Sequence, residues 1–323
     1  MALTSSLRHL LAALFVLAIS SPASSQSYPD KPITLVVPFP AGAATDRIAR
    51  SLANELGKRL GQSVIVENIG GASGALGGRR VVRAAADGYT LLLGTANDTI
   101  VAPLAMKTGY TIKDFTPIAK LSLNTTVLVA HPGFAANSVD ELVAIGRKSK
   151  EPLLVGAAGA AMMQTIGGML LAEAGGFKID NVVYKGGAPL LNDLIAGQVQ
   201  FGTVALPSAL PLIRSGKLKA LGVISTRRDP TAMDIPTVNE GQFVKGVEVD
   251  LWTGLFGPAN LPEAVVDRLS GALREIMGDQ VYRDAEFRAG SVVADFAPPA
   301  SFKKFVDGEE ARMKPIVATV KAE

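Results

Sequence analysis

The sequence predicts an α/β protein with parallel strands and two domains, on the basis of three observations. Short runs of apolar, often β-branched residues are followed repeatedly by a turn of small residues and then by a helix with one apolar face. Hydrophobic residues make up 48% of the chain and 33 residues are glycine, which suits buried parallel strands joined by tight turns. A chain of 323 residues is also long enough to divide into two domains with separate cores.

Residues 1–25 are expected to form a secretory signal peptide. Arg8 and His9 precede an apolar run from Leu10 to Ile19, and small residues surround the expected cleavage site near Ser25–Gln26. This run is about half as long as the roughly 20 residues that span a bilayer, and no later segment is long and uncharged enough. We therefore expect an exported protein whose mature chain does not insert into the membrane.

The composition argues against several functional classes. The chain has no cysteine, which excludes a lipid-anchored lipoprotein, a disulfide framework and thiol chemistry. Its formal net charge is only +3, charges of both signs are interspersed, and 6% of the residues are aromatic. Neither nucleic-acid binding nor attachment to a membrane surface is supported by this pattern.

The first strand–turn–helix unit starts with a buried strand at Leu35–Val37, which Pro38 ends. A helix follows, because apolar residues recur at four-residue spacing from Ile48 to Leu60, and either Thr45 or Asp46 is expected to cap its first turn. The N–H groups at a helix start stabilise an anion without a cationic side chain. A plain strand-to-helix connection explains the same stretch equally well. The candidate residues of this turn are Phe39, Pro40, Ala41, Gly42, Ala43, Ala44, Thr45 and Asp46.

The next two units repeat the pattern. A strand at Ser63–Glu67 leads into a glycine-rich segment at residues 68–78, which matches neither nucleotide-binding fingerprint and is better explained as a close-packed turn. A third strand at Tyr89–Thr95 ends in small and polar residues. Ligands sit at this end of the strands in an open α/β sheet, so Thr95, Ala96, Asn97 and Asp98 are candidates.

The middle of the chain predicts a second set of strands. After a strand at Thr125–Ala130, Ser138 and Glu141 form a capping box that opens a helix running to about Lys148. Further strands are expected at Leu153–Gly156, Val182–Tyr184, Val199–Ala205 and Leu218–Ser225. Two of their carboxyl ends supply candidates at the start of a following helix. These are Ala158, Gly159, Ala160, Ala161, Met162, Met163 and Gln164 after the first, and Tyr184, Lys185 and Gly186 after the second.

The C-terminal part predicts mostly helices. An amphipathic helix starts at Pro262–Glu263, and two more are expected at residues 279–289 and 299–320, flanking a short strand at Val292–Phe296. This part has too few strands to form a sheet of its own. We therefore expect it to pack on the first block, which makes the first domain discontinuous.

The mature chain resembles the Bug family, the periplasmic solute receptors of tripartite tricarboxylate transporters. The matching segments are residues 28–33 (YPDKPI), 37–42 (VPFPAG) with Thr45–Asp46, 87–91 (DGYTL), 183–186 (VYKG), 206–211 (LPSALP) and 216–221 (GKLKAL). The resemblance implies a type II periplasmic binding protein fold, in which two α/β lobes joined by a two-stranded hinge hold a carboxylate between them. It implies backbone donors from residues 38–46 and 157–164, and a membrane permease as partner. Lobe 1 is then expected at residues 26–125 plus 224–323 and lobe 2 at 126–223, in a periplasmic monomer that needs no cofactor.

The chain departs from the family pattern at several candidate positions. Ala43–Ala44 stands where the family usually has glycines, residues 160–163 are Ala-Ala-Met-Met instead of polar residues, and Val204 and Ala205 stand where many members have Asp-Asn. Because polar contacts are lost, these departures predict a carboxylate with an apolar body, contacted by Met162, Met163 and Tyr184, rather than citrate, malate or aspartate. Ordinary packing explains the same substitutions equally well.

The sequence offers little for catalysis. Apart from His9, His131 is the only histidine, no G-x-S-x-G elbow is present, and no His, Asp and Glu cluster has metal-ligand spacing. Asp46 and Asp98 are a conceivable acid pair, although a cap explains Asp46 better. We therefore expect no catalytic residue and no metal. An exported enzyme acting on a carboxylate or ester and a periplasmic sensor subunit remain the alternatives.

Overall fold

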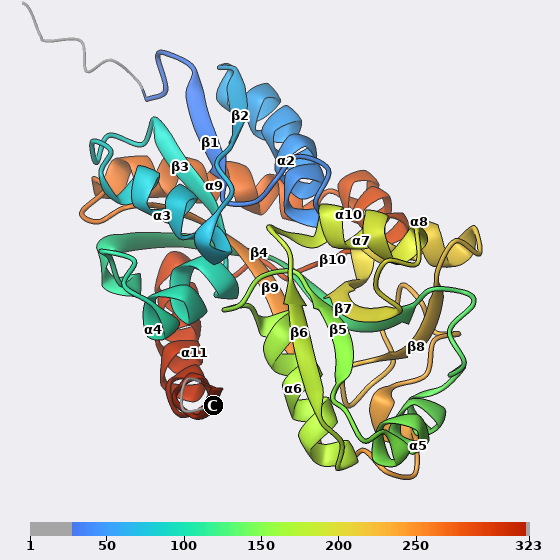
Figure 1. Ribbon diagram of the computed structural model, residues 1–323. Helices are drawn as coiled ribbons and strands as arrows, with labels where there is room; N and C mark the ends of the chain where they lie inside the picture. Colours follow the sequence, from blue (N-terminus) through green and yellow to red (C-terminus); the bar gives the residue numbers. More distant parts are fainter. Residues whose placement is uncertain (1–27, 321–323) are drawn as a thin grey trace, which may run out of the picture.

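The computed structural model describes residues 28–320, so the expected signal peptide lies outside the described residues. Within this range, ten strands form one continuous mixed sheet in the order β2-β1-β3-β9-β4-β7-β5-β6, with β8 and β10 also paired to β4 (Figure 1). Helices pack on the strands throughout, so the predicted α/β class is confirmed. No helix in the described range is long and apolar enough to cross a membrane.

One half of the sheet, here called sheet A, contains the first strands of the chain. Strands β1 (Ile33–Val37), β2 (Val64–Asn68) and β3 (Thr90–Thr95) pair in parallel, with β1 in the centre. Helices α2 (Ala44–Leu60) and α3 (Ala75–Val82) connect them. The leucines of α2 at the predicted four-residue spacing are buried against β1, as an amphipathic helix requires.

Strand β4 (Phe115–Ala130) joins the two halves of the sheet. Its residues 115–125 pair antiparallel with β9 (Asp250–Pro258), which also pairs with β3. Its last residues, 126–130, pair instead with β7 (Phe201–Ala205) and β8 (Lys219–Val223). Only the final six residues of β4 could be predicted from the sequence, because residues 115–124 contain a proline and several polar residues and show no continuous apolar run.

The other half, here called sheet B, contains the strands from the middle of the chain. Strand β5 (Leu153–Ala157) pairs in parallel with β6 (Ile179–Val183) and with β7. The connecting helices are α5 (Val139–Lys148), α6 (Met163–Gly175), α7 (Gly187–Ile195) and α8 (Leu206–Arg214). Ser138 caps α5 as predicted, because its side chain accepts a hydrogen bond from the Glu141 backbone N–H at 3.2 Å.

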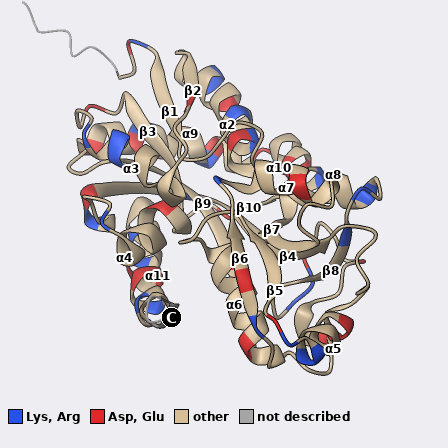
Figure 2. Cartoon of the chain, viewed as in Figure 1, with Lys and Arg blue, Asp and Glu red and all other residues tan. Residues whose placement is uncertain are grey.

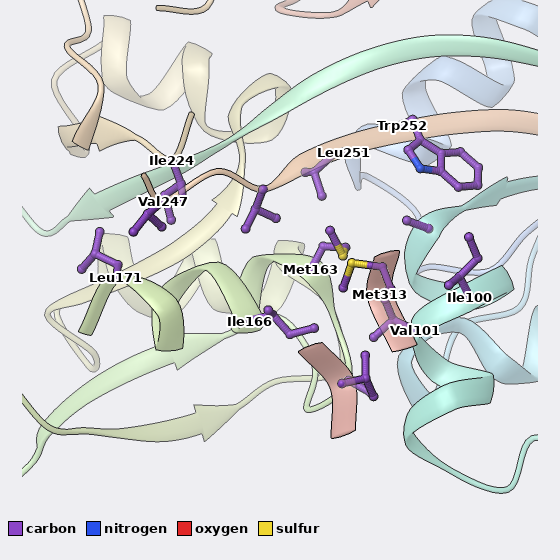
Figure 3. Packing of buried hydrophobic residues seen from close by; sticks show 14 of the residues in the cluster. Ile100, Val101, Met163, Ile166, Leu171, Ile224, Val247, Leu251, Trp252 and Met313 are labelled. Carbon is purple, nitrogen blue, oxygen red and sulfur yellow. The ribbon is translucent and has the colours of Figure 1, made fainter. Parts of the chain in front are cut away.

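The C-terminal helices return to sheet A, as Figure 1 shows. They are α9 (Glu263–Gly278), α10 (Gln280–Arg288) and α11 (Pro299–Val320), with the two-residue strand β10 (Val292–Val293) pairing to β4. Phe302 of α11 packs against Trp252 and Phe256 of β9. These rings belong to the large core cluster that Figure 3 shows in part.

Short helical segments complete the chain. A π-helix at Asn97–Val101 follows β3 and continues into α4 (Ala102–Ala105). Single 3₁₀ turns lie at Ala72–Gly74, Ile112–Asp114 and Val238–Glu240. The π-helix follows β3 directly, so it positions the predicted polar residues at the carboxyl end of that strand.

Two local predictions need correction. Helix α2 begins at Ala44 with Ala43 as its N-cap and has no side-chain cap, so neither Thr45 nor Asp46 caps it. Asp46 is the third residue of the helix, and its carboxylate accepts a hydrogen bond from the Gly42 N–H at 3.0 Å. The strand expected at Val292–Phe296 contains only two paired residues.

Candidate functional site

A cavity of about 70 Å³ lies where loops of sheet A face loops of sheet B. It is formed by residues at or after the carboxyl ends of β1, β3, β5, β6 and β7 and by residues of β4 and β9. The lining residues are Phe39, Ala43, Ala44, Thr45, Ile48, Thr95, Ala96, Asn97, Asn124, Ala158, Met162, Gln164, Gly187, Val204, Ala205, Ser208, Leu251, Trp252 and Thr253.

Four helix N-termini contribute to this lining. Helix α2 does so through Thr45, α6 through Gln164, α7 through Gly187 and α8 through Ser208, each within the first three residues of its helix. The free N–H groups and the partial positive charge of a helix start favour an anion. The lining contains no lysine, arginine, aspartate or glutamate, so these neutral groups dominate the electrostatics of the cavity.

Thr45 is the lining residue whose geometry is most informative. Its hydroxyl oxygen is buried and has no hydrogen-bond partner among the described residues. Buried polar atoms are normally paired, so an orphaned hydroxyl on a cavity wall suggests that a bound group completes the bond. Thr45 is the second residue of α2, where the backbone N–H also lacks an intrahelical acceptor.

Hydrogen bonds cross the cavity between the two halves of the sheet. The Ala44 N–H on α2 donates to the Ser208 hydroxyl on α8 at 3.1 Å. The Asn97 side-chain oxygen Oδ1 accepts the Met163 N–H at 2.7 Å, while its side-chain nitrogen Nδ2 donates to the Gln164 side-chain oxygen at 3.1 Å. Outside the cavity, the Ser73 hydroxyl accepts the Ala161 N–H at 3.2 Å.

Two carboxylates lie beside the lining without forming part of it. Burial of Asp46 alone would raise its pKa, but hydrogen bonds from Arg50 and from the Gly42 N–H hold the pKa below its usual value. Burial raises the pKa of Asp98 to about 7, although one carboxylate oxygen accepts from the Thr95 N–H at 2.8 Å and from its hydroxyl at 2.6 Å. The second Asp98 oxygen is buried and unpaired within the described residues.

A second hollow, of about 230 Å³, borders the cavity and is called here the outer hollow. Phe39, Ala158 and Met162 line both, so they separate the two spaces. The outer hollow contains Lys185 and Tyr184, whose hydroxyl donates to Asp193 at 2.8 Å. In Figure 2, Lys and Arg are interspersed with Asp and Glu on outer helices such as α2 and α5.

The structure sorts the candidate residues into three groups. Twelve line the cavity: Phe39, Ala43, Ala44, Thr45, Thr95, Ala96, Asn97, Ala158, Met162, Gln164, Val204 and Ala205. The outer hollow adds Gly159, Ala160, Tyr184, Lys185 and Gly186. Neither space is lined by Pro40, Ala41, Gly42, Asp46, Asp98, Ala161 or Met163. Met163 is 1% exposed and belongs to the core, where Figure 3 shows it pointing toward Met313 and Leu251.

Several lining residues were missed by the sequence analysis. They are Ile48, Asn124, Gly187, Ser208, Leu251, Trp252 and Thr253. In the sequence, Ile48 is an ordinary residue of the buried helix face. The β9 residues Leu251, Trp252 and Thr253 lie far along the chain from any candidate turn. Two of the missed residues carried a signal in the sequence: Ser208 lies in a segment that matches the family pattern, and Gly187 directly follows the candidate Gly186.

The chain is similar to known proteins over most of its length. Residues 48–321 match the profile of the tripartite tricarboxylate transporter family receptor. BugT of Bordetella pertussis is 31% identical over 305 residues, which cover 93% of this chain and 92% of BugT.

Two solved structures from Rhodopseudomonas palustris are similar over most of their length. MatC, solved with bound malate, is 31% identical with a TM-score of 0.82, and the match covers 90% of this chain and 100% of MatC. A second protein, solved with adipate, is 28% identical with a TM-score of 0.87, covering 91% of this chain and 98% of the other. The predicted periplasmic binding protein fold is thereby confirmed. The chain belongs to the tripartite tricarboxylate transporter receptor family, whose members are periplasmic solute-binding proteins.

Proposed function

We propose that this protein captures a small organic carboxylate in the cavity and delivers it to the membrane subunits of a tripartite tricarboxylate-type permease. The proposal rests on the unpaired Thr45 hydroxyl at a cavity wall formed by four helix starts. The malate and adipate in the two related structures support the same ligand class. We further propose that residues 1–25 direct export to the periplasm and that the receptor acts as a monomer.

We also propose that two lobes close on the ligand, with lobe 1 formed by residues 26–125 and the C-terminal part and lobe 2 by the middle of the chain. Near Thr126, β4 changes its pairing partner from β9 to β7 and β8, and this change supports the first boundary. Residues 224–249 pack on α5, where the Gln242 N–H donates to Asp140 at 2.9 Å. This contact supports a second boundary at about 249 rather than 224.

The Thr45→Val substitution tests carboxylate capture. Valine keeps the shape but removes the hydroxyl, and a lost hydrogen bond to a charged group costs about 1.5–3 kcal/mol, so affinity should fall at least tenfold. Thr34→Val on β1 is the matched control, because Thr34 lies outside the cavity on a strand that accepts valine readily. Calorimetric titration of both variants with a carboxylate library measures their affinities. Equal affinities in the two variants would argue against a carboxylate at the α2 start.

A further inference from the structure

Building on the proposed function, we infer that the receptor takes up a proton on Asp98 when it binds a carboxylate near neutral pH. The proton comes from the solvent and binds to the carboxylate oxygen Oδ2 of Asp98, behind the wall of the cavity. No bond of the bound acid changes, so the receptor binds an acid anion and a proton together.

Asp98 lies one hydrogen bond behind the lining of the cavity. It is the second residue of the π-helix and its exposed fraction is 0%. Its Oδ1 accepts the Thr95 hydroxyl at 2.6 Å and the Thr95 N–H at 2.8 Å. Thr95 and Asn97, the chain neighbour of Asp98, both line the cavity. A carboxylate in the cavity therefore lies on the other side of these two residues from the Asp98 carboxyl group.

The second carboxylate oxygen of Asp98 can accept a proton. Oδ2 is buried and has no hydrogen-bond partner among the described residues. An unpaired oxygen is more costly on a buried carboxylate than on a buried neutral carboxyl group, because the charge loses its hydration. Burial accordingly raises the pKa of Asp98 to about 7. Asp98 is therefore able to gain or lose a proton near neutral pH.

The surrounding chain holds Asp98 in this buried position. A Cβ built on Gly74 would lie 2.7 Å from the Asp98 Cβ, so the two backbones approach closely. The Tyr110 hydroxyl donates to the Asp98 backbone oxygen at 2.6 Å. Because these contacts fix the residue from two sides, its charge is relieved by protonation rather than by movement toward water.

The elements that pack on the π-helix give Asp98 no ion-pair partner among the described residues. Strand β3, helix α4 and the turn at Ala72–Gly74 carry no titratable side chain. On α3, Arg79 donates from Nε to the Thr108 carbonyl oxygen at 2.9 Å, and Arg80 is exposed. Tyr110 stays protonated, because burial and the charge of Asp98 raise its pKa.

Helices α11 and α6 also contact the π-helix. On α11, Glu309 is paired with Arg312 at 2.8 Å, Glu310 is half-buried, and the other charged side chains are exposed. Helix α6 contacts the π-helix through its first residues, whereas its charged residue, Glu173, is exposed near the other end. Neither helix compensates the charge of Asp98.

A carboxylate in the cavity adds a second negative charge close to Asp98. The lining contains no lysine or arginine to offset it. Asp46, the other carboxylate beside the lining, differs because it is ion-paired with Arg50 at 3.0 Å. A nearby like charge disfavours the ionised form of a carboxyl group, so the bound acid raises the pKa of Asp98 further. Proton uptake then accompanies binding, and the affinity falls as the pH rises through about 7.

Calorimetric titrations of the purified receptor with malate, adipate and benzoate test this coupling. Malate and adipate are the acids bound in the two related structures, and benzoate adds an apolar body. Carboxylic acids of this kind are ionised above about pH 6.5, so a change at higher pH acts on the protein. The affinity should fall at least threefold between pH 6.5 and pH 8.5. At pH 7.5, titrations in two buffers of different ionisation enthalpy should show uptake of about 0.3–0.6 proton per acid bound.

Two variants assign the proton to a residue. Asp98→Asn removes the titrating group, so proton uptake should disappear and the affinity should no longer depend on pH between 6.5 and 8.5. His131→Gln is the matched control, because histidine ordinarily titrates near neutral pH and His131 lines neither the cavity nor the outer hollow. It should retain the proton uptake of the wild type. A merely structural role of Asp98 would lower the affinity without removing its pH dependence.

The outcomes separate this inference from the proposed function. If an acid binds equally well at pH 6.5 and pH 8.5 without proton uptake, carboxylate capture stands and the proton coupling is wrong. The coupling to Asp98 is also wrong if proton uptake persists in Asp98→Asn or disappears in His131→Gln. If thermal unfolding shows that Asp98→Asn does not fold, the wild-type and His131→Gln titrations decide the question. If none of the three acids binds, the proposed function fails and the inference with it.

Discussion

Met162 and Met163 are neighbours in the chain but serve different parts of the molecule. Met162 is the N-cap residue of α6 and separates the cavity from the outer hollow. Met163 begins the helix and packs into the core with Met313 (Figure 3). The turn into α6 sends adjacent side chains in different directions, so only Met162 remains available to contact the body of a ligand.

Asp98 predicts a pH dependence of stability. Its pKa is raised by burial to about 7, whereas an aspartate in the unfolded chain titrates near pH 4. Between these values the folded state binds more protons than the unfolded state, so the free energy of unfolding should fall as the pH rises from about 4 to 7. Above about pH 7 this contribution should be constant.

The Asp98→Asn variant removes that titration while its side-chain oxygen still accepts from Thr95. Its stability relative to wild type should therefore increase between pH 5 and pH 8, by at most a few kcal/mol. Urea unfolding at the two pH values measures the change, with the exposed Asp267→Asn as control. An unchanged difference between wild type and Asp98→Asn would show that Asp98 does not titrate in this range.

At the scale of elements, the loop before α2 depends on a glycine in the left-handed backbone conformation. Gly42 has φ of +83°, and its N–H donates to Asp46. A side chain at this position would meet no atom within 4 Å, so a substitution acts through the backbone rather than by collision. A non-glycine residue in this conformation costs about 1 kcal/mol.

Gly42→Ala and Gly109→Ala form a matched pair, because Gly109 also has a positive φ, +80°, with open space around it. Both variants should lose about 1 kcal/mol of stability. Only Gly42→Ala should also weaken carboxylate binding, since it shifts the start of α2 at the cavity. Chemical denaturation and calorimetry measure the two effects. A similar loss of affinity in both variants would show that the loop before α2 has no specific role in carboxylate binding.

At the scale of the whole molecule, hydrogen bonds join the two halves of the sheet in and beside the cavity. Ala44 with Ser208, Asn97 with Gln164, and Ser73 with Ala161 each join sheet A or its connections to those of sheet B. Strand β4 connects the two halves covalently, as Figure 1 shows. Hinge closure around a ligand is the motion that such an arrangement permits.

We expect the ligand-free receptor to open and the bound receptor to match the described structure. Solution scattering should show a smaller radius of gyration with a saturating carboxylate, the one that binds most tightly in the calorimetric titrations, than without ligand. Asn97→Ala removes two bonds across the cavity and should increase the radius of the free protein further. Identical scattering profiles for free and bound wild type would contradict the closing motion.

The order and type of most elements could be predicted from the sequence, because periodicity and turn residues act locally. Helices α2, α5 and α9 and strands β1, β3 and β5 lie at or within a few residues of their predicted positions. The exceptions have non-local causes. Residues 115–124 of β4 have no strong local strand pattern and are extended because β9 pairs with them.

The sequence by itself determined the family, the α/β class and the turns that lead toward the cavity. Thr45, Asn97 and Met162 could be singled out because each follows a recognisable strand. Only the tertiary structure decided that Trp252, Leu251 and Ser208 join them, and that Met163 does not. The physical reason is that the cavity forms where the two halves of the sheet face each other, so its composition depends on contacts between residues far apart in the chain.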